Sequence, residues 1–286
     1  MNPLFYSALS PGAVSLSPSD FAGAASLAAA GGFAGLEIPV TSLGAETDDA
    51  SIRRILESNR LRPAGWGLPV EWRRDEAVWK EGLKNLPAWA KRAAALGSDR
   101  CSTWVLSFSD ECAFDENLAF HVERLNPIAA ILADHGCRFG LEYLGPRTIR
   151  EGHRHAFIHT AEEMLRLCRL VGPLTGLLLD SWHWFTAGET IDSILKLSAS
   201  DVVYVHVNDA PEGIPLDQQI DNRRCLPGAT GVIPIGSFLE ALVRIGYDGP
   251  VVPEPFDANL ATMADDRARV AAAGDSMRAI WKVAGF

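Results

Sequence analysis

Four side chains of the kind that bind metal ions stand at or near the ends of short apolar runs in the second half of the chain. The runs FGLE, GLLLD, VVYVHV and VVPE carry, in this order, Glu142, Asp180, His206 and Glu254. A carboxylate at the end of a buried strand is costly unless a positive group compensates it. One histidine with three carboxylates suits Mn2+, Mg2+ or Co2+ better than a structural Zn2+. We therefore predict a site for one divalent metal ion, with Zn2+ as a remaining option.

Each of these residues taken alone has a plainer interpretation, as an ion-pair partner or a helix cap. Four of them in consecutive equivalent positions are harder to explain in that way. Two further groups follow members of the set by three residues, His183 in LDSWHW and Asp209 in HVND. We expect both to project into the same site and to contact substrate. The alternatives are a loop histidine packed among tryptophans and an acid that supports the site or caps a helix.

The elements that must position these side chains alternate along the chain, a short apolar run followed by a segment of helical period, eight times. The predicted strands are Leu4–Ser7, Gly35–Ile38, Arg62–Gly65, Cys101–Leu106, Phe139–Glu142, Gly176–Leu179, Val202–Val207 and Pro250–Pro253. The clearest helices are Ser19–Ala30, Asp75–Leu96, Glu116–His135, Thr160–Val171 and Ser237–Ile245.

The strand sequences indicate how these elements pack. GLLLD, VVYVHV and GPVVPE are almost continuously hydrophobic, as parallel strands covered on both faces should be. A doubly wound open sheet would more often show a Gly-rich phosphate turn after its first strand, and SALSPGAVS matches that poorly. We predict the α/β class, with a single (β/α)8 TIM barrel filling residues 1–286. Catalytic groups of this fold come from the C-terminal ends of the strands.

Composition and charge exclude several partners. The formal net charge of −10 and the lack of a Lys/Arg run argue against nucleic acid. No basic segment precedes an apolar stretch at the start, and no window is apolar for the roughly 18 residues of a spanning helix. The five scattered cysteines are typical of reduced thiols. We expect a cytoplasmic protein that binds neither nucleic acid nor membrane.

The site residues together resemble the sugar phosphate isomerase/epimerase group of xylose isomerase-like barrels, which includes tagatose 3-epimerase, inosose isomerase and dehydratase, and hydroxypyruvate isomerase. The likeness is detailed from the fifth strand to the eighth and holds in outline before that. It rests on the spacing Glu142, Asp180-x-x-His183, His206-x-x-Asp209 and Glu254. The resemblance implies a small keto-sugar, sugar phosphate or inosose as substrate, and a role in carbohydrate metabolism.

The resemblance also implies roles for these residues. Glu142, Asp180, His206 and Glu254 would bind one divalent ion, and His183 would contact a substrate oxygen. Glu142 and Glu254 would also form the acid/base pair of an isomerase or epimerase. The ion would chelate adjacent carbonyl and hydroxyl oxygens and stabilise an enediolate. The two carboxylates would remove a proton from one face of the carbon and return it to the other.

A substrate-binding arginine usually follows the seventh strand in this group. The segment NDAPEG behind His206 contains none, and the first candidates are Arg223 and Arg224 in DNRRCLPGATGVI. That arrangement is similar to the inosose-type members, whose loop carries an arginine just ahead of a Pro-Gly turn. We favour Arg223 for substrate binding. Arg224 and a surface position for both stay open.

Further candidates lie on earlier strands and on one long loop. Trp66 and Glu37 could form walls of the pocket, since an aromatic face suits the C–H side of a sugar, although core packing is the default for Trp66. Arg147, His153 and His155 could reach a substrate hydroxyl or phosphate, or simply be exposed loop residues.

Other functions are compatible with the same residues to different degrees. A metal-dependent lyase or dehydratase would use the same ligands, because an enediolate with a leaving group on the next carbon expels it. An endonuclease IV-like nuclease would need three zinc ions and more ligands than seven histidines allow. A non-catalytic sugar-binding barrel has no need for three converging carboxylates. Whether the chain forms a homo-oligomer stays open.

Overall fold

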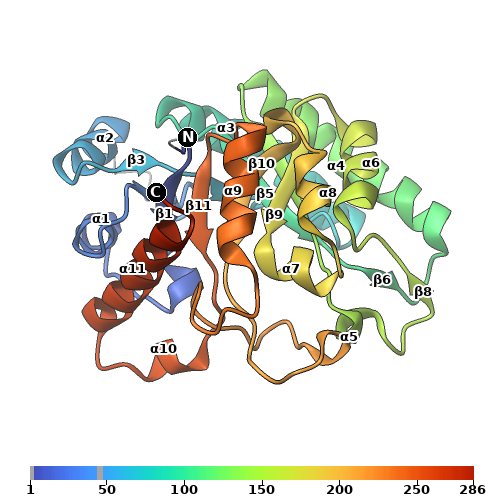
Figure 1. Cartoon of the computed structure of the whole chain (residues 1–286). Coiled ribbons are helices and arrows are strands. Elements are labelled where there is room, and N and C mark those ends of the chain that lie inside the picture. Colours follow the sequence, from blue (N-terminus) through green and yellow to red (C-terminus); the bar gives the residue numbers. More distant parts are fainter. Residues whose placement is uncertain (1–2, 44–47) are drawn as a thin grey trace.

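The computed structural model describes residues 3–43 and 48–286. Its main sheet is parallel and has the strand order β3-β2-β1-β11-β10-β9-β7-β5-β4, with helices placed around it (Figure 1). The strands of this sheet are β1 Tyr6–Leu9, β2 Gly35–Leu36, β3 Arg62–Pro63, β4 Trp66–Gly67, β5 Arg100–Val105, β7 Arg138–Tyr143, β9 Thr175–Asp180, β10 Val202–Val207 and β11 Pro250–Pro253.

The sheet closes on itself through one segment. β3 and β4 stand at opposite ends of the strand order, yet they are separated by only Ala64 and Gly65 in the chain. The Ala64 N–H donates to Leu36 O at 2.9 Å, and the Leu68 N–H donates to Ser102 O at 2.8 Å. The segment therefore pairs with β2 on one side and β5 on the other. The result is an eight-stranded barrel, and the predicted TIM-barrel fold is confirmed.

The helices form the layer outside the sheet, and large apolar side chains fill the space between the two. The N-terminal cap predicted for the first helix is present, since the Gly23 N–H donates to Asp20 Oδ1 at 2.7 Å. The helices are α1 Phe21–Ala30, α2 Asp49–Ser58, α3 Glu76–Ala95, α4 Phe114–Asp134, α5 Arg147–Arg150, α6 Ala161–Val171, α7 Ser181–Thr186, α8 Ile191–Leu195, α9 Ile235–Ile245, α10 Ala258–Thr262 and α11 Asp266–Val283.

Most predicted strands lie within two residues of the observed ones, and β10 and β11 have the predicted bounds. The first strand begins later than predicted, because Leu4 is exposed and β1 starts at Tyr6. A small antiparallel pair, β6 Phe108–Ser109 with β8 His155–Ala156, lies outside the barrel sheet and has no signal in the sequence. Its strands are two residues long, too short for an apolar period to appear.

A small apolar cluster fills the interior of the barrel. Its members come from several strands and the closing segment, and they are Ala8, Ala64, Leu178, Tyr204 and Val252, with Tyr6 against them. Within the described residues no helix is long and apolar enough to cross a membrane. All five cysteines are free.

Candidate metal centre

Strand geometry places the predicted ligands in the mouth of the barrel. Asp180, His206 and Glu254 each stand two residues after a side chain of the interior cluster. Because side chains alternate along a strand, residues two apart point to the same side, here into the barrel. In the parallel register His206 lies opposite Asp180 on β9 and opposite Val252 on β11. Asp180 and His206 therefore lie at one level, and Glu254 follows two residues beyond it, just past the end of β11.

The four predicted ligands converge. Glu142, Asp180, His206 and Glu254 each offer one ligand atom, and these atoms lie within 4.8 Å of one another. His206 Nδ1 is 3.3 Å from Glu254 Oε2, 3.5 Å from Glu142 Oε1 and 3.9 Å from Asp180 Oδ2. Glu142, Asp180 and His206 are buried. The group could hold one metal ion.

The hydrogen bonding of the cluster fits a divalent cation. Glu142 Oε1 and His206 Nδ1 are buried, and neither has a hydrogen-bond partner in the part of the chain that is described. A buried polar atom without a partner costs about 1–3 kcal/mol, so an absent ligand or ion is the usual explanation. Three carboxylates and one imidazole are donors that hard and borderline divalent ions accept. Both the types of donor atom and the two buried atoms without partners therefore fit a bound divalent cation.

The charges of the cluster shift the pKa values of its members in different directions. Burial, together with the nearby Glu254 and Asp180 carboxylates, raises the pKa of Glu142 to about 7 against the lowering effect of His206. Burial also acts on Asp180, but the Arg224 charge overcomes it and holds that pKa well below its ordinary value. Burial opposes protonation of His206, yet the Glu254 and Glu142 carboxylates raise its pKa well above the usual range. In the metal-free site His206 therefore carries a proton.

Arg224 completes the charge balance of the site. Its Nη1 donates to Asp180 Oδ2 at 2.8 Å and to Glu254 Oε2 at 3.1 Å, and its Nη2 donates to Asp221 Oδ1 at 2.7 Å. The residue is only 4% exposed, so these partners are what make a buried guanidinium tolerable. Arg223, the residue favoured by the sequence, is exposed instead. The arginine that reaches the acids is Arg224.

His183 lies beside the cluster because α7 begins directly after β9. Asp180 caps this helix, with its Oδ1 accepting from the Trp182 N–H at 2.6 Å and the His183 N–H at 3.4 Å. Nδ1 of His183 accepts from the Gly145 N–H at 3.2 Å, and its Nε2 is 3.2 Å from Arg224 Nη2. Burial lowers the pKa of His183 to about 4, so the ring is neutral near pH 7.

Asp209 does not reach the site. It is fully buried, and its carboxylate accepts four backbone hydrogen bonds. The donors are the N–H groups of Ala210 at 2.8 Å, Gly231 at 2.7 Å, Thr230 at 2.9 Å and Ile233 at 2.9 Å. Its own backbone pairs with Cys225. The expectation that Asp209 binds substrate is therefore corrected: this acid holds together the loop that carries Arg224.

A cavity of about 430 Å3, the metal cavity below, opens over the cluster. Glu142 and Glu254 line it, as do His183 and Arg224, whereas Asp180 and His206 are not among its lining residues. Sequence reasoning missed the other lining residues, which are Trp104, Leu106, Leu144, Ile149, Asp221, Asn222 and Phe256. Trp104 and Phe256 expose 41% and 40% of their surface, and apolar residues carry no sequence signal for such exposure.

The remaining candidates lie elsewhere. Trp66 and Glu37 line another cavity of about 440 Å3. Burial raises the pKa of Glu37, whose Oε1 accepts from the Tyr204 hydroxyl at 2.8 Å. Arg147 forms surface ion pairs with acids, His153 Nδ1 lies 2.8 Å from Asp110 Oδ2, and His155 belongs to β8. None of these five residues lines the metal cavity.

Comparisons with known proteins identify the family of this chain. A family model described as a xylose isomerase-like TIM barrel matches residues 25–280. The chain belongs to this family. Among its relatives, the inosose isomerase of Halalkalibacterium halodurans is 25% identical over 207 residues, which cover 72% of this chain and 70% of that protein. The family resemblance inferred from the sequence is therefore confirmed.

Two solved structures show the same fold. A xylose isomerase domain protein from Alicyclobacillus acidocaldarius subsp. acidocaldarius has a TM-score of 0.87 at 28% identity, with 99% of this chain and 100% of that chain covered. The IOLI protein, whose crystal structure has a bound zinc atom, has a TM-score of 0.78 at 20% identity, with 96% and 98% covered.

Proposed function

We propose that this protein is a divalent-metal-dependent isomerase or epimerase that moves a proton on a small keto-sugar, sugar phosphate or inosose. The observation that carries the proposal is that two carboxylates of the ligand cluster also face the metal cavity. Glu142 and Glu254 both line it, and they come from β7 and β11, the outer two of the four strands that supply the cluster. The relative named inosose isomerase supports the substrate class.

The proposed acid/base pair is Glu142 and Glu254. Because β9 and β10 lie between their strands, the two carboxylates approach the cavity from different sides. With one carboxylate on each side of the cavity, one residue can accept the proton from carbon while the other returns a proton to it. When bound, the metal ion would supply Lewis acidity, polarising the carbonyl and acidifying the neighbouring C–H.

Asp180 and His206 serve as the supporting ligands, since neither lines the cavity. The zinc atom bound by the IOLI protein supports keeping Zn2+ as an option beside Mn2+, Mg2+ and Co2+. Neutral His183 and the Arg224 guanidinium, both at the wall of the cavity, would orient substrate oxygens. These roles fit a site that holds a polyol by several hydrogen bonds while one C–H is exchanged.

The test is proton exchange at carbon. The metal-loaded protein is incubated in D2O with a panel of ketoses and inososes, and carbon-bound deuterium is followed by NMR. Isomerase or epimerase chemistry predicts that deuterium enters the sugar and that no water is lost. Glu142→Gln is expected to slow this deuterium entry by at least about 100-fold. Deuterium entry with loss of water would instead assign a dehydratase. No exchange with any sugar of the panel would contradict the proposal.

A further inference from the structure

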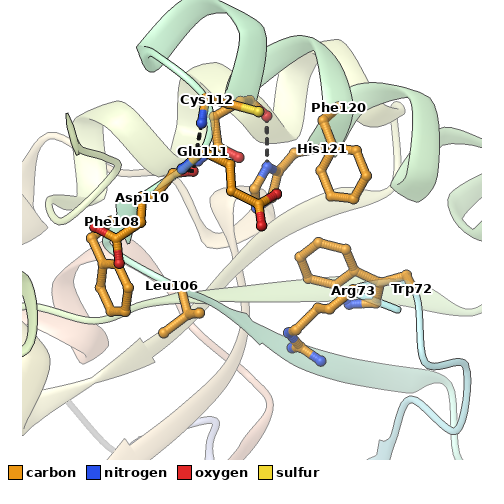
Figure 2. Close-up of a pocket in the computed structure, with 11 residues that line it drawn as sticks. Trp72, Arg73, Leu106, Phe108, Asp110, Glu111, Cys112, Phe120 and His121 are labelled. Carbon is orange, nitrogen blue, oxygen red and sulfur yellow. Dashed lines mark hydrogen bonds between the residues drawn. The ribbon is translucent and has the colours of Figure 1, made fainter. Parts of the chain in front are cut away.

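A further cavity, the side cavity below, is the one drawn in Figure 2. It measures about 380 Å3, which is within the range of about 300–1,000 Å3 of small-ligand sites. In Figure 2 the rings of Trp72 and Phe120 stand on one side of it and Phe108 on the other. Leu106, directly after β5, lines both the side cavity and the metal cavity. The two spaces are therefore neighbours.

The division between the cavities is a stack of three side chains. The Arg73 guanidinium lies 4.4 Å from the ring centre of Trp72 and 3.8 Å from that of Trp104. Trp72 lines the side cavity, and Trp104 lines the metal cavity. Arg73 is fixed there because its Nη2 donates to Thr103 Oγ1 at 2.9 Å. Leu106 and this stack are therefore the side chains that stand between the two cavities.

The side cavity combines apolar walls with polar atoms that lack partners. His121 is 5% exposed, and its Nδ1 lies 2.7 Å from Asn117 O, so that nitrogen carries the proton. Burial lowers the pKa of His121 to about 4, which leaves Nε2 as an acceptor. Within the described chain His121 Nε2 has no hydrogen-bond partner, and the exposed Glu111 carboxylate also lines the cavity. The side cavity therefore offers two acceptors, His121 Nε2 and the Glu111 carboxylate, to a ligand that can donate.

A hydroxylated ring fits this combination better than an apolar one. Hydroxyl groups donate, so two of them on one ring can satisfy both Glu111 and His121. The C–H faces of a sugar ring pack against aromatic rings such as those of Trp72 and Phe120. A purely apolar ligand would bury the free polar atoms without partners, at a cost for each.

We propose that the side cavity binds a second sugar ring, so that the substrate of this protein is a keto-sugar or inosose carrying a glycosyl substituent. The inference rests on the proposed function, because it places the reacting ring at Glu142 and Glu254. It adds a binding site on the far side of Leu106, formed by the loop after β4, residues 106–112 between β5 and α4, and the first half of α4.

The test compares ketose disaccharides with the bare ketose. Isomaltulose, maltulose and fructose are titrated calorimetrically into the Mn2+-loaded full chain. At least one disaccharide is expected to bind about 10-fold or more tightly than fructose. Phe120→Ala should remove this advantage, whereas Phe21→Ala should keep it, because Phe21 is a matched half-buried ring that lines the cavity of Trp66 and Glu37.

A second variant guards against a folding defect in Phe120→Ala. Glu111 is exposed, so Glu111→Ala should leave the fold intact and reduce the disaccharide advantage at least about 3-fold. Equal affinity for fructose and both disaccharides, no binding of either disaccharide, or an advantage that survives both variants would overturn the inference. If a disaccharide binds more tightly than fructose but no sugar exchanges deuterium, the proposed reaction is contradicted and the second sugar site is supported. Deuterium exchange without any disaccharide advantage would leave the proposed reaction standing and overturn the second sugar site.

Discussion

His206 must release a proton before it can bind a cation through Nδ1. The Glu254 and Glu142 carboxylates hold its pKa well above the ordinary value, although burial opposes this. A metal ligand must be deprotonated, so binding of the ion and loss of this proton are coupled. The same carboxylates therefore attract both the metal ion and the proton that competes with it.

We expect Mn2+ binding to release protons and to weaken as the pH falls. Protonation of His206, and of Glu142 below its pKa of about 7, competes with the ion, so affinity should drop up to about 10-fold per pH unit for each proton displaced. Titration calorimetry at pH 7 in buffers of different ionisation enthalpy measures the number released. A binding enthalpy that is independent of the buffer, with pH-independent affinity, would refute the coupling.

Asp209 illustrates a different residue role, that of organising a loop. Asp209→Ala leaves four backbone N–H groups without their acceptor, and each buried donor left unsatisfied costs about 1–3 kcal/mol. We expect the free energy of unfolding to fall by at least ~3 kcal/mol in chemical denaturation. Asp217→Ala, on an exposed acid 3.7 Å from Arg147, is the control and should change it by less than about 0.5 kcal/mol. Similar losses in both variants would disprove the assignment.

Among the site residues, those at the ends of strands could be predicted from the sequence, whereas those on loops could not. The four ligands were predictable because each ends or follows an apolar run, and the two-residue period of a strand then decides their direction. Arg223 and Arg224 could not be separated, because their loop has no periodicity and only the Asp221 and Asp180 contacts decide which one turns inward. The prediction for Asp209 was wrong because its partners, residues 230–233, are distant in sequence and bond through the backbone.

The barrel closes where the backbone of Gly65 approaches Tyr204 and the β5 backbone closely. A Cβ on Gly65 would lie 2.5 Å from Tyr204 Cε2 and 2.8 Å from the backbone oxygen of Arg100. Tyr204 belongs to the apolar cluster inside the barrel, and the Arg100 oxygen belongs to β5, so neither can move freely. This glycine therefore lets the closing segment reach β5.

Gly65→Ala is expected to destabilise the protein by about 2–3 kcal/mol through overpacking. Gly67→Ala is a matched control two residues away, because a Cβ there meets no atom within 4 Å. Both substitutions remove the same backbone freedom from the unfolded chain, so the difference between them reports the native clash. Urea denaturation of the two variants measures it. Equal midpoints would show that the closing segment tolerates a side chain.

The order of strands and helices was predictable from the sequence. The way in which the third predicted strand closes the barrel was not. Buried parallel strands with crossover helices give a strong apolar pattern, and β10 and β11 were predicted with their observed bounds. The predicted strand Arg62–Gly65 is split by the structure into β3 and β4, because the segment changes partner from β2 to β5 along its length. Such a change of partner depends on neighbours that the local sequence does not specify.

At the scale of the whole molecule, the C-terminal helix α11 and the residues after it pack against the segment just before β1. The Phe5 ring packs against Trp281 and Phe286, with ring centres 5.3 Å and 5.8 Å apart. Residues near both ends of the chain thus belong to one core around the barrel. We propose, in keeping with the length, that residues 1–286 form a single domain.

A bound ion should stabilise this whole structure, because the four ligands converge only in the folded state. At a free Mn2+ concentration 100 times its dissociation constant, the gain is about 2.7 kcal/mol, which should raise the melting temperature by several degrees. Differential scanning calorimetry with and without Mn2+ measures this. Glu142→Gln, which removes one ligand with little change in shape, should show a much smaller rise, and an equal rise would place the stabilising ion elsewhere.

The most direct test of the account is the position of the ion itself. A crystal grown with MnCl2 is measured near the manganese absorption edge, and the anomalous difference map is calculated. We predict one strong peak within about 2.0–2.6 Å of ligand atoms from all four of Glu142, Asp180, His206 and Glu254. A well-ordered cluster without an anomalous peak, or a peak bound by other residues, would contradict the metal centre and with it the proposed reaction.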